Sequence, residues 1–108
     1  MTQLPVLDES KFESIKGEPR AVIFKHSNRC SISSNAHREV SKYLKDHPES
    51  EIFLIDVVAQ RPLSNAVADH LGVRHESPQI LLLKNGSVAW HISHFDITAK
   101  ALQNELAS

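Results

Sequence analysis

The chain has 108 residues, with 12 Lys or Arg against 13 Asp or Glu, so its formal net charge is −1. This length suits one domain over residues 1–108 with a single apolar core, and the near-zero charge disfavours a nucleic-acid partner. No apolar run approaches the roughly 20 residues of a membrane helix, so no membrane partner is expected. The first twelve residues have no basic start and no apolar stretch, and the chain has one cysteine, so we expect no secretory signal and a cytoplasmic protein.

The first half of the chain alternates between helix and strand patterns. Asp8–Lys16 is predicted as a short helix that Asp8 caps. The apolar run Ala21–Lys25 predicts a buried strand. Cys30–Lys45 carries small or apolar residues at spacings of three and four, which is typical of a helix. Glu51–Val58 is a second, mostly apolar run and is expected to be a strand covered on both faces.

The second half of the chain continues with a helix, a hairpin and a last helix. Leu63–Leu71 is predicted to be helical, and Gln79–Leu83 is predicted as the third strand. Asn85–Gly86 is a tight-turn dipeptide, so Ser87–His91 should return antiparallel. Asp96 is expected to cap a final helix that runs to Leu106.

The order of these elements restricts the fold. Two strands that flank a long helix imply a parallel pair joined by a right-handed crossover, whereas the final hairpin must be antiparallel. We therefore predict an α/β fold with a four-stranded mixed sheet and helices on both faces. This is the layout of a thioredoxin-like domain.

Cys30 stands where the first predicted strand gives way to the long helix. Free N–H groups and the positive end of the helix dipole stabilise a thiolate at such a position. Lys25, His26 and Arg29 precede it and add positive charge; His26 either stabilises the thiolate as an imidazolium or ends the strand at the surface. The alternative is an inert buried cysteine, but the polar surroundings Ser27–Ser34 favour a reactive thiol.

Other polar residues near these elements have two interpretations each. Ser33 lies three positions after Cys30, so it either donates a hydrogen bond to the thiolate or satisfies the helix start. Pro78, which follows Ser77, would be a trans turn proline on local grounds, whereas the predicted fold favours a cis-proline beside the cysteine. The histidines show no metal-ligand pattern with partners, so no metal site is expected.

The string Ile23–Ser33 (IFKHSNRCSIS), together with the later Ser77–Pro78–Gln79, resembles the monothiol bacilliredoxins. These are small cytoplasmic thioredoxin-like proteins of the bacillithiol system, with the typical signature F-K-H-S-x-x-C-P-I-S. The resemblance extends over nearly the whole chain. It implies that Cys30 is the nucleophile and that Ser33 occupies the resolving position.

The resemblance also assigns residues around the thiol. It implies that Pro78 is the active-site cis-proline, preceded by Ser77. Ser31 departs from the signature, which has proline there, and its extra N–H bears on the acidity of the thiol and on its low-molecular-weight partner. The residues expected to bind substrate or tune the thiolate are Lys25, His26, Arg29, Ser31 and Ser77.

The implied function is a monothiol disulfide oxidoreductase that removes bacillithiol from S-thiolated client proteins by exchange at Cys30. No bound cofactor is expected; the co-substrate is bacillithiol or another low-molecular-weight thiol, such as glutathione or coenzyme A. Two alternatives stay open. One is a non-catalytic thioredoxin-like module that grips partner strands at Pro78, and the other is a monothiol glutaredoxin-like protein that shares an iron–sulfur cluster between two subunits.

Overall fold

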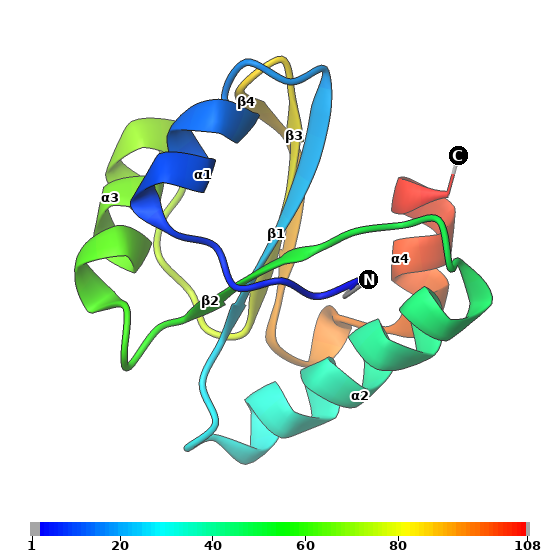
Figure 1. The fold of residues 1–108 in the computed structure, drawn as a ribbon. Coiled ribbons are helices and arrows are strands. Elements are labelled where there is room, and N and C mark those ends of the chain that lie inside the picture. The colour runs from blue at the N-terminus through cyan, green and yellow to red at the C-terminus, as the bar shows by residue number, and fades with distance from the viewer. Residues whose placement is uncertain (1–2, 108) are drawn as a thin grey trace.

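The centre of the molecule is a four-stranded mixed sheet with the order β2-β1-β3-β4, shown in Figure 1. The computed structural model describes residues 3–107. The strands are β1 (Arg20–His26), β2 (Phe53–Asp56), β3 (Gln79–Lys84) and β4 (Ser87–Ser93). β1 pairs parallel with β2 and antiparallel with β3, which in turn pairs antiparallel with β4. The predicted mixed sheet is confirmed.

Helices cover both faces of this sheet, as predicted. α1 (Glu9–Ile15) and α3 (Arg61–Leu71) lie on one face, and α2 (Ser31–Asp46) and α4 (Ala99–Leu106) lie on the other (Figure 1). None of the helices within residues 3–107 is both long and apolar enough to cross a membrane. Each helical layer buries its own apolar cluster against the sheet.

Residues of β1 alternate between the two buried clusters because successive strand side chains point to opposite faces. Val22 and Phe24 belong to the cluster under α2 and α4, whereas Ala21 and Ile23 belong to the cluster under α1 and α3. Lys25 continues the second series and therefore faces α3. Its direction matters for the site described below.

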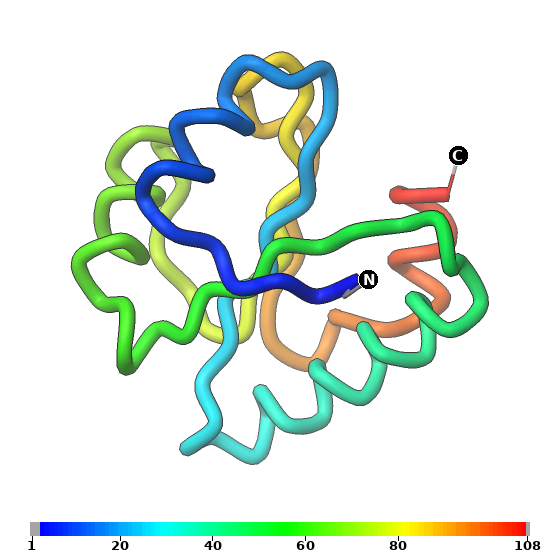
Figure 2. Tube along the Cα trace, viewed as in Figure 1, coloured from blue at the N-terminus to red at the C-terminus, as the bar shows by residue number. Residues whose placement is uncertain are grey.

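The amino-terminal segment covers the outer edge of β2, a contact that the sequence patterns did not predict. Ile52 N–H donates to Gln3 O at 2.9 Å, and Leu54 N–H donates to Pro5 O at 2.8 Å. Leu7 N–H donates in turn to Leu54 O at 2.7 Å. Figure 2 shows the blue amino-terminal tube running beside the green β2 segment. This pairing shields backbone groups that a bare edge strand would expose.

α3 begins two residues before its predicted start and β4 ends two residues after its predicted end. Two other predicted boundaries are wrong for local reasons. β2 is shorter than Glu51–Val58, because Asp56 Oδ1 accepts the N–H groups of Val58 and Ala59, both at 3.0 Å, and turns the chain. Asp96 does not cap the last helix; it ends a 3₁₀ turn, η1 (His94–Asp96). Ile97 must stay extended to bury its side chain, so the helix starts later, with Thr98 as its cap.

The predicted turn between β3 and β4 is confirmed. Asn85 and Gly86 both have positive φ, at 53° and 81°, as a type I′ hairpin turn requires. A Cβ atom at Gly86 would lie 2.6 Å from the carbonyl oxygen of Lys16, so a glycine is required there.

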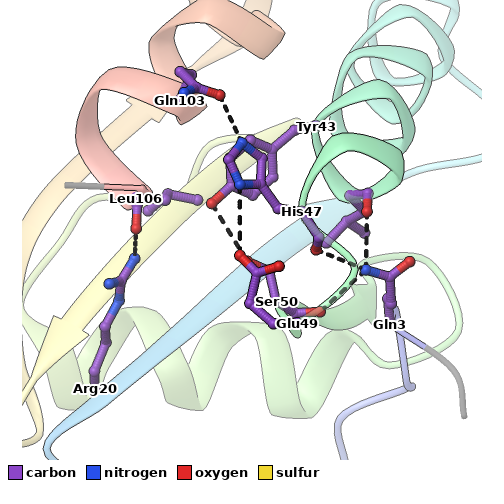
Figure 3. Close-up of polar contacts among 9 residues, drawn as sticks. Gln3, Arg20, Tyr43, His47, Glu49, Ser50, Gln103 and Leu106 are labelled. Atoms are coloured by element: carbon purple, nitrogen blue, oxygen red, sulfur yellow. Dashed lines mark hydrogen bonds and ion pairs between the residues drawn. The ribbon is translucent and has the colours of Figure 1, made fainter.

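The carboxyl ends of α2 and α4 meet the start of β1 at one end of the sheet, shown in Figure 3. Arg20 donates to Leu106 O, and His47 Nε2 lies 2.6 Å from Gln103 Oε1. Gln3 Nε2 donates to His47 O at 2.9 Å. A hollow of about 540 Å³ is lined by Arg20, His47, Gln103 and Leu106, among others. It is at the opposite end of the sheet from the point where β1 leads toward α2.

Candidate active site

Cys30 is the N-cap residue of α2, as the sequence predicted. Its backbone is extended, with φ −123° and ψ 128°, and its carbonyl accepts the first helical hydrogen bond, from Ser34 N–H at 3.1 Å. The thiol forms no capping hydrogen bond with any residue that the structure describes, and Cys30 is partly exposed. The sulfur therefore stands at the amino end of a 16-residue helix, beside the free backbone N–H groups of its first turn.

Ser33 closes the loop that carries the cysteine. Ser33 is fully buried, and its Oγ accepts the N–H of Ser27 at 3.3 Å. Ser27 Oγ in turn accepts the N–H of Arg29 at 3.3 Å. This geometry supports the interpretation of Ser33 as a group that satisfies backbone near the helix start. Its hydroxyl proton is still free to be donated elsewhere, so a bond to the thiolate stays a prediction.

Pro78 lies at the same end of the sheet as the Cys30 loop. Gln79 is the register partner of Lys25, so Pro78 comes beside the end of β1. The Ser77–Pro78 peptide bond is cis, as the resemblance implied. Pro78 is buried, and its carbonyl accepts His94 N–H at 3.0 Å. Ser77 Oγ is buried and has no hydrogen-bond partner within residues 3–107.

The three basic residues before Cys30 do not form one cluster. Lys25 is completely buried, and its Nζ donates to Ser64 O of α3 at 3.0 Å. It therefore cannot contact a substrate directly. His26 faces the opposite side of the sheet, next to Phe24 and α2. Arg29 is exposed in the loop, and so is Ser31 at the first position of α2.

His26 packs in a small aromatic group beside the cysteine loop. Its ring lies 5.4 Å from that of Phe24 and 5.0 Å from that of His37. Burial and the neighbouring His37 lower the pKa of His26, while Asp56 and the backbone of Ser33 act in the opposite direction. Its Nδ1 is buried with no partner among the described residues. Of the two interpretations of His26, the lowered pKa therefore disfavours the imidazolium.

Sequence analysis missed three residues that surround Pro78. His75 Nδ1 lies 3.1 Å from Lys25 Nζ, and Glu76 Oε2 lies 2.5 Å from His94 Nε2. The hydrogen bond from His94 is the main reason that the pKa of Glu76 is lowered. His75 and Glu76 fall within three residues of Pro78, which was a usable signal, but their partners come from distant parts of the chain. No group of three or more potential metal ligands occurs within residues 3–107.

Known structures identify the class of protein. One is described as an oxidoreductase candidate with a thioredoxin fold; it matches with a TM-score of 0.86 and 31% identity, over 94% of this chain and 92% of its own. Thioredoxin from Trypanosoma brucei brucei matches with a TM-score of 0.77 and 14% identity, over 98% and 88%. Thioredoxin from Plasmodium falciparum matches at 0.73 and 14%, over 98% and 97%. The chain has the thioredoxin fold.

The family follows from a profile match. The profile described as monothiol bacilliredoxin BrxC matches residues 5–102. The chain therefore belongs to the monothiol bacilliredoxin family, in agreement with the resemblance. Family and fold together support a role of the thiol-oxidoreductase type, with the single cysteine as its only thiol.

Proposed function

We propose that this protein is a cytoplasmic monothiol oxidoreductase that removes bacillithiol from S-thiolated proteins. The position of Cys30 carries the proposal. The only thiol of the chain stands partly exposed at the amino end of α2, at the sheet end that also holds the cis Ser77–Pro78 bond. Membership of the bacilliredoxin family supports bacillithiol as the carried thiol.

The proposed reaction consists of two thiol–disulfide exchanges. The Cys30 thiolate attacks the bacillithiol sulfur of the client's mixed disulfide, and the client leaves as a thiolate that takes up a proton. Bacillithiol is then disulfide-bonded to Cys30. A second bacillithiol thiolate attacks its sulfur, which yields bacillithiol disulfide and releases Cys30. No second protein cysteine is required, in agreement with the composition.

The surrounding residues have supporting roles in this proposal. The backbone of Ser77 and Pro78, directly before β3, would hold the client strand beside the sulfur. Arg29 is the exposed cation of the loop and would attract the anionic part of the low-molecular-weight thiol. Ser31 adds a backbone donor where the family signature has proline, which bears on the choice among bacillithiol, glutathione and coenzyme A.

The test is intact-mass spectrometry of the reduced protein after brief incubation with each of the three oxidised thiols. Wild type and Cys30→Ser are compared from pH 6 to pH 9, and release of bacillithiol from an S-bacillithiolated peptide is followed in parallel. We expect a rapid single adduct on wild type below pH 8, selective for bacillithiol, and none on Cys30→Ser.

Each other outcome contradicts part of the proposal. Equal reaction with all three thiols would overturn bacillithiol as the specific carrier. An adduct that forms only slowly at alkaline pH, with no peptide turnover, would overturn catalysis and favour the binding module. An iron–sulfur chromophore in anaerobically purified protein would favour the cluster-carrying alternative.

A further inference from the structure

Lys25 is a charged side chain inside an otherwise apolar layer. It is fully buried, and its register partner on β2 is the buried Ile55. Its Nζ donates to Ser64 O at 3.0 Å and lies 3.1 Å from His75 Nδ1. Ser64 Oγ is also 3.4 Å from the same His75 nitrogen. Lys25 thus contacts both α3 and the segment before Pro78.

Stability alone is a poor explanation for this lysine. Burial of an ammonium group costs free energy that two hydrogen bonds only partly recover, and an apolar side chain of similar volume is often as stable or more so. The positions of its hydrogen-bond acceptors indicate a role in holding neighbouring segments. Both acceptors lie outside β1, and one of them lies three residues before Pro78.

The segment Arg74–Ser77 is held by further contacts on its other sides. Gln79 Nε2 donates to Arg74 O at 3.1 Å. Glu76 pairs with His94, whose own N–H donates to Pro78 O. Glu76 is half-buried and His94 is exposed, so solvent screens the interaction between them. The Lys25–His75 contact, like the Gln79–Arg74 hydrogen bond, is part-buried and is made by a side chain that is fully buried.

We propose that Lys25, acting through His75, positions the Arg74–Ser77 segment so that Ser77 and Pro78 receive the client strand. Lys25 is then a positioning residue, because it never touches the disulfide. This inference rests on the proposed function, and it identifies the Lys25–His75 contact as the interaction that holds the segment proposed to bind the client.

Charges around the pair fix its state near neutral pH. Burial lowers the pKa of Lys25 to about 8, so the amine is still mostly protonated at pH 7. Burial, Lys25 and Arg61 lower the pKa of His75, while Glu76 opposes them. Protonated Lys25 is therefore the donor and neutral His75 is the acceptor. Above pH 8 the charged donor is lost and the contact weakens.

Steady-state kinetics on an S-bacillithiolated peptide test this role. In Lys25→Met we expect KM for the peptide to rise about tenfold with kcat changed by less than about twofold, since the loss of one charge-assisted hydrogen bond is of that size. His75→Leu should give the same change from a less buried position. Lys84→Met is the matched control, because Lys84 is exposed at the other end of β3 and should keep the wild-type KM.

Two readouts separate positioning from general support of the fold. The KM of wild type should rise above pH 8, whereas that of Lys25→Met should stay flat over the same range. In ¹⁵N spectra, wild-type His75 should be a neutral ring with Nδ1 as acceptor, and its pKa should rise in Lys25→Met.

The outcomes that overturn the proposal are distinct from those that overturn the function. Turnover of the peptide by wild type, with unchanged KM in folded Lys25→Met and His75→Leu, would leave the function in place and reject the positioning role. If Lys25→Met lowered kcat and the melting temperature together, the positioning role would also be rejected. No turnover by wild type would reject the function and the positioning role together.

Discussion

Adjacent residues of one strand have unrelated tasks in this protein. Lys25 and His26 are neighbours in sequence, yet Lys25 is bound to α3 and His26 stacks near α2, because strand side chains alternate. Charge counted along the sequence therefore overstates the positive potential at Cys30. Of Lys25, His26 and Arg29, only Arg29 is exposed.

The His26–His37 contact has a measurable consequence. Because His37 lowers the pKa of His26, His37→Gln should raise it toward the ordinary value of 6.5, and burial should still keep it below that value. Ring ¹H–¹³C spectra recorded during a pH titration give the midpoint of His26 in wild type and in His37→Gln. His91→Gln, at an exposed position on β4, is the control and should leave His26 unchanged. A wild-type His26 that titrates at or above 6.5 would contradict this account.

At the scale of elements, the residue at which a helix begins determines the position of the side chains beside it, Cys30 among them. α2 begins directly after Cys30. In the loop before it, the hydroxyl oxygens of Ser27 and Ser33 accept hydrogen bonds from backbone N–H groups. The periodicity of the sequence predicted this helix to within one residue at its end. The start of α4 was not predicted, because Asp ranks above Thr as a cap residue and the local pattern therefore favoured Asp96 over Thr98. Only the burial of Ile97 selects Thr98.

A pair of cap variants tests that assignment. Thr98 Oγ1 accepts Ala101 N–H at 3.1 Å, so Thr98→Ala should lower the free energy of unfolding by about 1 kcal/mol. Asp96→Ala should change it by less than about 0.5 kcal/mol, as expected for an exposed residue without a cap bond. Urea denaturation of both variants at pH 7 measures the difference. A larger loss in Asp96→Ala would restore the sequence prediction.

At the scale of the whole molecule, the basic side chains with lowered pKa values shape the dependence of stability on pH. The folded state lowers the pKa of Lys25, His26 and His75, so it binds fewer protons than the unfolded state between each lowered pKa and the ordinary one. Stability therefore rises with pH through each of these windows. For the histidines the window lies below 6.5, and for Lys25 it extends from about 8 to 10.5.

Denaturation curves from pH 5 to pH 10 should show both slopes. Stability is expected to fall as the pH drops below 6.5 and to rise from pH 8 upward, by at most roughly 3–4 kcal/mol for Lys25 at about 1.4 kcal/mol per pKa unit. Lys25→Met should flatten the alkaline rise, and His26→Gln combined with His75→Gln should flatten the acid fall. Slopes that persist in these variants would assign the effect to other groups.

The sequence by itself determined the element order, the sheet type, the hairpin turn and the place of Cys30 at a helix start. These follow from periodicity, turn residues and short-range backbone chemistry, which act over a few residues. The tertiary structure alone decided that Lys25 meets His75, 50 residues away, that His26 stacks on His37, and that residues 3–7 cover β2. Such contacts depend on which faces pack together, and that is set by the burial of the whole core rather than by any local pattern.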